Sequence, residues 1–403
     1  MGGTGQQTIR LLTFTTLFPN AGQPNHGVFV ENRLRHLLAT GQASSTVVAP
    51  VPWFPIRSAR AGRWSQFAHA ERTETRDGLA IHHPRFPLIP KLGMLAAPAA
   101  LYAASVLAIG RLVRQGLRFD AIDAHYLYPD GVAAVLLGRH FGKPVVITAR
   151  GSDVTQLPDF AGPRRMIRWA MAKADALISV SAGLKQAMVA LGASPDAVTV
   201  LRNGVDLEMF RPADRAACRQ SLGLTGPTLL SVGHLIERKG HHHVIAALAL
   251  LPGWRLLIVG DGPERGRLQR LAADRGAADR VQFLGPQPHS TLSRFYTAAD
   301  ELILASSREG WANVLLESMA CGTPVVASNI PGSSEVVQQP AAGLVVDQNT
   351  PEAFAAGVAS VYAGTPDRRA TRAYAEQFSW DATSAGQLDV FRSVLARAGA
   401  GGS

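Results

Sequence analysis

Short apolar segments of strand length alternate with helical segments along almost the whole sequence, and the alternation runs through the chain twice. Six such segments precede residue 207: Ile9–Phe14, Thr46–Val51, Ala121–Ala124, Val145–Ala149, Ala176–Val180 and Val198–Leu201. Five more follow: Thr228–Val232, Arg255–Val259, Val281–Leu284, Glu301–Ala305 and Pro324–Ala327. Near-continuous apolar strands suit a parallel sheet covered on both faces, and the helices between them form βαβ crossovers. The pattern predicts an α/β fold with two doubly wound parallel sheets.

The chain is long enough for two such domains, because 403 residues with 47% hydrophobic content can bury two cores. We expect an N-terminal domain over residues 1–206 and a C-terminal domain over residues 207–378. Residues 379–403 are expected to form a helix that crosses back to the first domain, with a flexible tail. Open α/β sheets bind ligands beyond the carboxyl ends of their strands, so two facing domains would enclose an interdomain cleft.

The cysteines and the N-terminus bear on where the protein works. Cys218 and Cys321 are the only cysteines and form no CxxC pair, which favours a reducing compartment. The first residues, MGGTGQQ, lack the charged and apolar parts of a signal peptide. The apolar stretch Leu92–Gly110 contains Pro98 and is mostly alanine, which favours a packed amphipathic or buried helix over a membrane span. We expect a cytoplasmic protein.

The net charge of +10 comes entirely from the first half of the chain. Residues 1–206 hold 22 of the 40 Lys and Arg but 12 of the 30 Asp and Glu, which leaves 18 of each for residues 207–403. A basic half could face nucleic acid, anionic lipid or acidic substrates. A solvated basic surface without a partner explains the same excess equally well.

The segment EGWANVLLE (Glu309–Glu317) is the strongest functional signal, because it leads from a loop into a predicted helix. Asn313 is an accepted N-cap residue, so the N–H groups of Val314, Leu315 and Leu316 would be free at the positive end of the helix. Such an end binds phosphate without a side chain. A diphosphate is the expected guest.

Two carboxylates flank this helix start. Glu317 lies one position beyond the capping-box site, so we expect its carboxylate to be free to accept hydrogen bonds from a ribose. Glu309 lies in the loop, where bound phosphates would repel a carboxylate. Its presence is explained if it binds sugar hydroxyls or stabilises a developing positive charge. A surface carboxylate paired with Arg308 is an equally good interpretation of Glu309.

A second loop, within VGHLIERKGHHH, presents Arg238 and Lys239 ahead of a helix. Cations here can neutralise a leaving diphosphate. The sequence contains no Asp-x-Asp motif, so these cations would replace a divalent metal. Consecutive histidines on a helix point about 100° apart and cannot share one ion, so we interpret His241–His243 as structural. GDGPERG (Gly260–Gly266) departs from the GxGxxG spacing of a dinucleotide site.

These motifs together resemble family 4 of the retaining glycosyltransferases. The resemblance is carried by EGWANVLLESMACGTPVVAS with PGSSEVV after it and the ERKG loop and GDGPER before it. In the first half it continues through PNHGVFVENRLRHL, DAHYLYPDG, TARGSD and RNGVD, so it covers nearly the whole chain. It implies the GT-B fold of two facing Rossmann-like domains, a hexosyltransferase activity and retention of configuration.

The resemblance also implies a role for individual residues. His125 and Glu309 would be catalytic, with Glu309 beside the transferred sugar and His125 in the cleft; taken alone, His125 could equally be a satisfied core histidine. Glu317 would bind the ribose, Lys239 the diphosphate, and Gly27 would begin a helix that approaches the phosphates or the acceptor. The full donor-binding set comprises Gly27, His234, Arg238, Lys239, Gly310, Trp311, Asn313, Val314, Leu315 and Glu317. His234 departs from the arginine that most family members carry there.

The expected reaction moves a sugar from a nucleotide diphosphate donor to a glycan or lipid-linked glycan, without a metal or cofactor. The Arg-rich, Trp-containing segment Ser58–Arg72 favours work against an anionic membrane at its inner face, as in bacterial cell-surface polysaccharide assembly, and not on nucleic acid. Two alternatives stay open: a sugar-nucleotide epimerase of related architecture and a non-catalytic nucleotide-sugar-binding protein.

Overall fold

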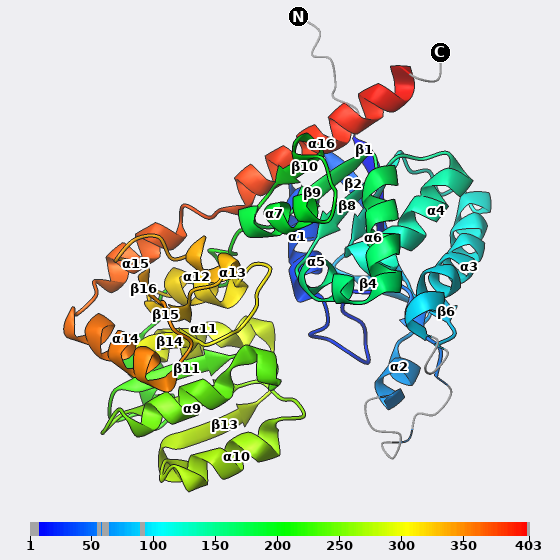
Figure 1. Cartoon of the computed structure of the whole chain (residues 1–403). Helices are drawn as coiled ribbons and strands as arrows, with labels where there is room; N and C mark the ends of the chain where they lie inside the picture. Colours follow the sequence, from blue (N-terminus) through cyan, green and yellow to red (C-terminus); the bar gives the residue numbers. More distant parts are fainter. Residues whose placement is uncertain (1–7, 55–57, 59–63, 89–92, 401–403) are drawn as a thin grey trace, which may run out of the picture. The chain divides into compact units, whose positions relative to one another are not determined.

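The protein consists of two compact units, seen in a computed structural model that describes residues 8–54, 58, 64–88 and 93–400 (Figure 1). The first unit runs to Arg202 and takes up the chain again from Asp381, whereas the second unit spans Asn203–Trp380. The expected division lay at residues 206 and 378, within a few residues of these points. Each unit is described by itself below.

The first unit is built on a sheet of eight strands in the order β10-β9-β8-β7-β1-β2-β5-β4. Its strands are β1 (Ile9–Phe14), β2 (Ala43–Val48), β3 (Val51–Pro52), β4 (Thr73–Arg76), β5 (Leu79–His82), β6 (Arg85–Phe86), β7 (Ala121–His125), β8 (Val145–Ala149), β9 (Ala176–Ser179) and β10 (Val198–Val200). Its helices are α1 (Val28–Ala39), α2 (Ser65–His69), α3 (Gly93–Arg114), α4 (Val132–Phe141), α5 (Ser152–Thr155), α6 (Ala161–Lys173), α7 (Ala182–Ala190) and α16 (Trp380–Ala400). All pairings in the large sheet are parallel except β4 with β5, while β3 and β6 form a separate pair.

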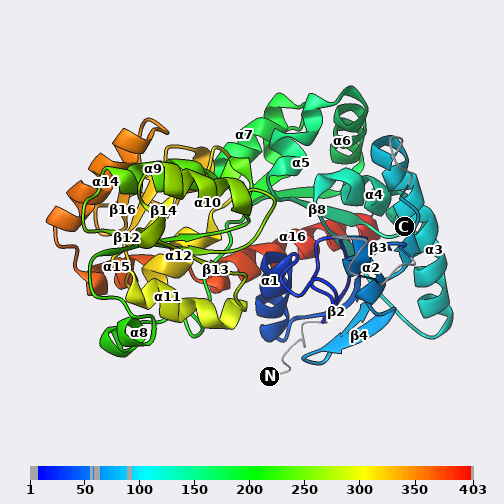
Figure 2. The ribbon, with the colours of Figure 1, turned by 90° about the horizontal axis from the view of Figure 1, so that it is seen from below.

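Helices cover both faces of this sheet, which explains its apolar strands. On β8, Val146 faces the core that contains Leu388 and Phe391 of α16, while its neighbour Val145 lies against Gly138 of α4. Successive strand residues point to opposite faces, so both sides of β8 are covered. Figures 1 and 2 show α3 beside α4 at the outer edge of the unit, and these helices are in contact.

The second unit has six parallel strands in the order β13-β12-β11-β14-β15-β16. They are β11 (Thr228–Val232), β12 (Arg255–Val259), β13 (Val281–Gly285), β14 (Glu301–Leu304), β15 (Val325–Ser328) and β16 (Gly343–Val346). The helices are α8 (Arg215–Ser221), α9 (His241–Ala249), α10 (Arg265–Asp274), α11 (Leu292–Ala298), α12 (Asn313–Ala320), α13 (Pro331–Ser334), α14 (Pro351–Ala363) and α15 (Arg368–Ala375). Counted along the unit, the order is that of a Rossmann fold, with its switch point between β11 and β14.

The predicted fold class is confirmed, and the differences lie at the edges of the sheets. The sequence interpretation missed the hairpin β4–β5 and the edge strand β16. Around Asp77–Gly78, β4 alternates exposed and half-buried residues, and β5 alternates buried Leu79 and Ile81 with more exposed residues, so the hairpin has no apolar run. The strand expected at Thr46–Val51 is also shifted, because β2 ends at Val48 and β3 begins at Val51.

The apolar stretch of the first half forms α3, which packs along one side only. Pro98, Leu101, Ser105 and Ile109 are buried at helical spacing. By length and composition α3 could cross a membrane, and 22% of its most apolar window is buried within the protein. The helix is therefore packed along a stripe and leaves apolar side chains in solvent.

Candidate active site

The carboxyl ends of β11 and β14 carry the charged residues expected to bind the donor. The loop after β11 contains the 3-10 turn Glu237–Lys239, and the loop after β14 contains Ser306–Glu309. Neighbouring parallel strands with helices on opposite sides leave a crevice at such a switch point. The topology therefore brings Lys239 and Glu309 together although 70 residues separate them.

Lys239 and Glu309 form a close ion pair in this crevice. Lys239 Nζ lies 2.6 Å from Glu309 Oε1, which also accepts a hydrogen bond of 2.7 Å from Ser306 Oγ. Burial raises the pKa of Glu309, but Lys239, Ser306 and Arg238 together outweigh burial and lower this pKa below its usual range. Glu309 is thus ionised at neutral pH, and its partner is Lys239 and not Arg308.

Arg238 ties the two loops to each other. Its guanidinium donates to the carbonyl of Arg308 at 2.7 Å and lies 3.7 Å from Glu309 Oε2. In return, its own carbonyl accepts a hydrogen bond of 2.9 Å from the Ser307 N–H. Two cations and one carboxylate therefore share this edge of the sheet, which leaves a positive excess for an anion.

Two glycines allow these loops to approach closely. Gly240 adopts φ 68° and ψ 17° directly before α9, and a Cβ there would lie 2.0 Å from the Ala305 carbonyl oxygen. Gly332 of α13 would place a Cβ 2.7 Å from the Glu309 carbonyl oxygen. Only glycine fits both positions, so PGSS supports the Glu309 loop.

The start of α12 differs from the expectation in its cap. The N-cap is Ala312, which makes no side-chain hydrogen bond, and Asn313 is the first helical residue. The Asn313 side chain instead accepts a hydrogen bond of 3.2 Å from Asn203, and the Leu315 N–H donates to Ala312. Among the described residues, the N–H group of Val314 has no acceptor. One of the three expected donors is therefore free at the helix start.

Glu317 is less free than predicted. Tyr296 Oη donates to its Oε2 at 2.7 Å, and His289 Nε2 lies 3.1 Å from its Oε1. Both partners come from the segment around α11, which the sequence motif did not include. Burial and the Glu317 carboxylate raise the pKa of Tyr296 well above its ordinary value, so the phenol keeps its proton at neutral pH and donates it in the hydrogen bond to Glu317. Each Glu317 oxygen can still accept one further hydrogen bond.

The remaining donor-site residues of the second unit lie in different environments. Gly310 is half-buried, and Trp311 is buried with its ring 6.3 Å from that of Phe378, so Trp311 packs inside the unit. His234 is exposed, and its side chain makes no hydrogen bond or ion pair with any residue the structure describes. His234 is the one residue of the predicted set whose side chain is open to solvent at the crevice.

The motif GDGPER has a packing role in this crevice. A Cβ at Gly260 would lie 1.9 Å from the Gly233 carbonyl oxygen, and one at Gly262 would lie 2.4 Å from that of Leu235. These glycines let the loop after β12 lie against the loop after β11. The interpretation of GDGPERG as something other than a dinucleotide site fits this packing.

In the first unit, His125 ends β7 at the corresponding switch point, between β1 and β7. Arg150 donates to His125 Nδ1 at 2.8 Å, and Asp123 Oδ2 lies 3.3 Å from Nε2. Because a guanidinium has only donors, Nδ1 must accept, and the ring proton must lie on Nε2. Burial lowers the pKa of His125 to about 4, so the ring is neutral.

A buried polar network surrounds His125 that the sequence interpretation did not weigh. Asp153 accepts hydrogen bonds from the N–H groups of Leu127 at 2.8 Å and Gly151 at 2.7 Å. Asp130 accepts from the backbone N–H and, at 3.1 Å, from the hydroxyl of Thr16. Burial raises the pKa of Asp130 to about 7. The signal was present in DAHYLYPDG and TARGSD, where aspartates lie within or shortly after the apolar segments that form β7 and β8.

Gly27 stands at the same switch point. It is the N-cap of α1 with φ 73° and ψ 21°, as the sequence predicted for a helix start. A Cβ there would lie 2.3 Å from backbone atoms of Leu17, so the loop after β1 can turn back only over a glycine.

The described residues contain no group of three or more His, Cys, Asp or Glu side chains arranged to hold a metal ion. His241 is buried with Nδ1 3.0 Å from Ser231 Oγ, and burial lowers its pKa to about 4. The neighbouring rings of His242 and His243 pack against each other. The histidine triplet therefore has the structural role that was expected.

Both units are Rossmann-like, and the second carries cations at the carboxyl ends of β11 and β14, which is the architecture of GT-B glycosyltransferases. Comparisons with known proteins support this class. Residues 214–378 match the family described as glycosyl transferases group 1, and residues 34–209 match glycosyltransferase family 4. The chain belongs to the family 4 glycosyltransferases.

Named relatives support this assignment. A D-inositol 3-phosphate glycosyltransferase of Acidothermus cellulolyticus is 37% identical over 69% of this chain and 68% of its own length. Another, of Thermobispora bispora, is 31% identical over 80% of this chain and 82% of its own.

Solved structures share the fold. Sucrose-phosphate synthase from Thermosynechococcus elongatus has a TM-score of 0.80 at 21% identity, covering 97% of this chain and 100% of its own. Anabaena HepE in complex with UDP and glucose has a TM-score of 0.74 at 20% identity, covering 96% and 100%.

Proposed function

We propose that this protein transfers a hexosyl group from a nucleoside diphosphate sugar to an acceptor hydroxyl, with retention of configuration and without a metal ion. The observation that carries the proposal is the group formed by Lys239, Arg238, Glu309 and the free start of α12 at one switch point. A diphosphate matches both the positive excess and the open Val314 N–H at the start of α12. Among similar structures, HepE has been solved with UDP-glucose.

The diphosphate would lie between the Val314 N–H and the two cations. Lys239 can bind the diphosphate while it keeps its bond to Glu309, because Nζ has three N–H donors and Glu309 Oε1 accepts from one of them. As the bond from the anomeric carbon to the phosphate oxygen breaks, its electron pair moves onto the diphosphate. Fixed cations stabilise that charge most where they need no rearrangement, which is the role a metal has in other transferases.

The acceptor oxygen would attack the anomeric carbon from the face that the diphosphate leaves. Its proton passes to the departing phosphate oxygen, so no protein base is required. The ionised Glu309 would stabilise the positive charge that develops on the sugar ring, and the unused lone pairs of Glu317 would accept from the ribose hydroxyls.

His125 would act as a hydrogen-bond donor. Arg150 occupies the lone pair of Nδ1, so the ring cannot take up a proton there without losing that bond. Its neutral Nε2–H can donate to a sugar hydroxyl. Gly27 would bring the backbone at the start of α1 toward the substrates.

For the acceptor, we propose a glycan or a lipid-linked glycan on the cytoplasmic side of a membrane, as in assembly of bacterial cell-surface polysaccharide. The basic first half of the chain supports an anionic acceptor or surface. Relatives named D-inositol 3-phosphate glycosyltransferase make a phosphorylated polyol the second candidate. Both candidates carry a hydroxyl nucleophile and negative charge.

A thermal-shift screen with nucleotide sugars, followed by a nucleotide-release assay, tests the proposal. A true donor should raise the unfolding temperature more as its concentration increases. Without an acceptor, the nucleotide should be released only at the slow rate of donor hydrolysis, and adding the acceptor should raise this rate. Conversion of the donor sugar without any acceptor would instead establish an epimerase. Stabilisation by a donor without release in the presence of either acceptor class would establish a binding protein.

A further inference from the structure

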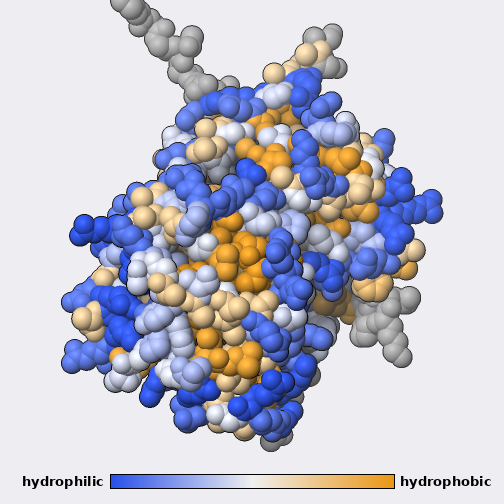
Figure 3. Space-filling view, turned by 60° about the vertical axis from the view of Figure 1, so that its left-hand side comes forward, coloured by the Kyte–Doolittle hydropathy of each residue, from blue (hydrophilic) through white to orange (hydrophobic). Residues whose placement is uncertain are grey.

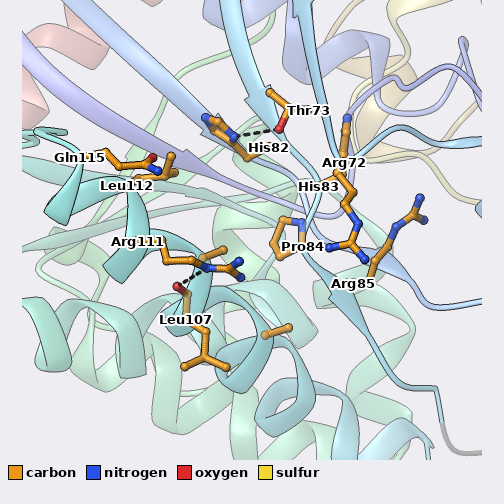
Figure 4. A pocket seen from close by; sticks show the side chains of 12 residues that line it. Arg72, Thr73, His82, His83, Pro84, Arg85, Leu107, Arg111, Leu112 and Gln115 are labelled. Atoms are coloured by element: carbon orange, nitrogen blue, oxygen red, sulfur yellow. Dashed lines mark hydrogen bonds between the residues drawn. The ribbon is translucent and has the colours of Figure 1, made fainter.

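The first unit contains a pocket of about 500 Å³ away from its switch point, between the hairpin β4–β5 and the second half of α3 (Figure 4). We name it the arginine pocket; it is lined by Arg72, Thr73, His82, His83, Pro84, Arg85, Ala104, Leu107, Ala108, Arg111, Leu112 and Gln115. In the sheet, β1 and β2 lie between β5 and β7, which carries His125. Three strand spacings amount to roughly 14 Å, so the pocket is distinct from the His125 region.

The lining of the arginine pocket has three guanidinium groups and no carboxylate. Arg85 is fixed, because it donates to the carbonyl of Phe67 at 2.6 Å and to that of Ala70. Among the described residues, Arg111 donates to the carbonyl of Leu107 at 3.2 Å, and the Arg72 side chain has no hydrogen bond or ion pair. Glu74 Oε1 lies 2.8 Å from Nε2 of the lining residue His83, so one carboxylate stands against three arginines. The excess of positive charge favours an anion.

A phosphate group fits this lining better than a carboxylate or a neutral ligand. A guanidinium binds phosphate oxygens through two parallel N–H groups, and three of them can satisfy a single phosphate. Figure 4 shows Arg111 on the side of α3 and Arg72 and Arg85 on the opposite side of the pocket, with His82 beside Thr73. His82 Nδ1 lies 3.4 Å from Thr73 Oγ1, so the imidazole is held at the wall of the pocket.

The rim of the pocket is apolar on the side of α3. Leu107 lines the pocket and is 67% exposed, and Met94 and Leu95 are exposed further along the same helix. On the face shown in Figure 3, apolar residues form several separate patches among hydrophilic ones, so exposure alone does not mark a docking surface. On α3, Leu107 is both strongly exposed and part of the lining of the cationic pocket, whereas Met94 and Leu95 lie near the N-terminal end of the helix.

Aromatic residues lie on the other side of Arg85. Trp64 precedes α2 and is 40% exposed, with its ring 5.8 Å from that of Phe67. The Phe67 carbonyl accepts the hydrogen bond from Arg85, so this aromatic pair adjoins the arginine pocket. Partly exposed tryptophan next to cations is typical of surfaces that lie at the level of lipid headgroups.

We propose that the arginine pocket binds the phosphate group of an anionic lipid headgroup, with the exposed side of α3 against the lipid. The surface would then hold the enzyme at a membrane independently of the nucleotide-sugar site. Arg72 ends the segment Ser58–Arg72 that the sequence singled out for membrane contact; residues 59–63 of that segment lie outside the described residues.

Vesicle binding of the full-length protein tests this inference. Sedimentation with phosphatidylcholine vesicles that contain phosphatidylglycerol is compared for the wild type and the double variant Arg72→Gln/Arg111→Gln. Each cation at a charged membrane surface is worth about a fivefold change in affinity, so the double variant should bind roughly 25-fold more weakly. Thermal unfolding checks that this variant is folded, and donor-induced stabilisation checks that its nucleotide site is intact.

The matched control is Arg270→Gln/Arg275→Gln, which removes two exposed arginines of the second unit that do not line the pocket. It should lose no more than about threefold, through the general surface potential alone. An equal loss in both double variants, or equal binding of the wild type to pure phosphatidylcholine, would overturn the proposal. If millimolar inorganic phosphate raises the unfolding temperature of the wild type but the wild type does not bind the vesicles, the pocket binds a soluble phosphate. That result would overturn the proposal of a lipid headgroup.

Discussion

The switch points of the two units have the same topology but differ in burial and charge: the first holds a buried, neutral histidine, and the second holds a partly exposed ion pair. In the first unit, the ends of β1 and β7 carry His125, Asp123 and Asp130, all buried, with His125 exposed by only 1%. In the second unit, the ends of β11 and β14 carry Lys239 and Glu309, whose side chains stay 17% and 10% exposed. Burial drives His125 toward its neutral form, while the ion pair keeps Glu309 charged.

The difference indicates separate tasks for the two crevices. A group that must neutralise a phosphate needs a charge that the ligand can reach, and Lys239 meets this condition. A group that must orient a substrate gains from a rigid network: Arg150 holds His125 at Nδ1, while Nε2, 3.3 Å from Asp123, has no hydrogen-bond partner among the described residues. The structure therefore favours charge stabilisation in the second unit and positioning in the first.

The largest expected effect is on turnover. Lys239→Ala removes the reachable cation and should lower kcat/KM by about 100- to 1000-fold, a cost typical of one fixed electrostatic group. Steady-state nucleotide release measures it. Arg255→Ala serves as the control, because Arg255 begins β12 at the opposite end of the sheet and its loss should change the rate less than about twofold. Unchanged turnover in Lys239→Ala would break the assignment of the charged crevice.

The two crevices share one backbone device, and breaking it should destabilise both units. Gly27 and Gly240 cap α1 and α9 with nearly the same left-handed dihedral angles, and each lies against backbone atoms. Gly27→Ala and Gly240→Ala should each lower the free energy of unfolding by about 3 kcal/mol or more.

Gly41→Ala and Gly253→Ala are the matched controls for these substitutions. Both glycines also have positive φ, at 71° and 79°, but a Cβ there meets no atom within 4 Å. These variants should lose only about 1 kcal/mol in urea unfolding. Similar losses at all four positions would show that strain at positive φ, and not the close approach, decides the cost.

Each unit contains a buried neutral histidine that contributes to the pH dependence of stability. The pKa of His125 is about 4 in the folded protein, against an ordinary value of 6.5, so the unfolded chain binds more protons between these pH values. Stability from His125 is thus fully present above pH 6.5 and falls as the pH drops to 4, by at most about 3 kcal/mol. His125→Gln should flatten this part of the curve in urea unfolding.

His241→Gln is the counterpart in the second unit, where the pKa of His241 is also about 4. This variant should lower the slope of the free energy of unfolding against pH, between pH 4 and 6.5, by a similar amount. If His125→Gln leaves the slope between pH 4 and 6.5 unchanged, the neutral, network-bound ring in the first crevice would be refuted.

The smallest effect is expected at Glu317. Glu317→Gln keeps the shape but weakens the acceptor for ribose hydroxyls, so the dissociation constant of the free nucleotide should rise about 5- to 10-fold in calorimetry. Glu352→Gln, on the exposed first turn of α14, removes the same charge and should leave binding unchanged. Equal affinity of both variants would place Glu317 outside the nucleotide site and leave it a role in holding Tyr296.

Much of the fold was predictable, because buried parallel strands appear as apolar runs. Val145–Ala149, Thr228–Val232 and Arg255–Val259 were expected with the bounds that β8, β11 and β12 have. The hairpin β4–β5 was missed, since an edge pair alternates in polarity and lacks such a run. Periodicity identifies strands buried on both faces far more reliably than strands at an edge.

The sequence predicted which residues form the candidate site, but it did not predict which side chains bind them. The loops that carry Lys239 and Glu309 follow strands, which is where ligand-binding residues of such sheets lie. Adjacency in the chain favoured Arg308 as the partner of Glu309, but Lys239 holds it across the switch point. Glu317 was expected to be free, yet His289 and Tyr296 reach it from a segment some 20 to 28 residues earlier.

The sequence by itself determined the alternation of strands and helices, the glycines that cap α1 and α9, and the types of residue at both crevices. These are local properties, set by side-chain period and by the backbone angles that only glycine adopts freely. The tertiary structure decided which charges meet. The tautomer of His125, the Lys239–Glu309 pair and the convergence of Arg72, Arg85 and Arg111 all depend on strand order and helix packing, which join residues that local chain chemistry leaves unrelated.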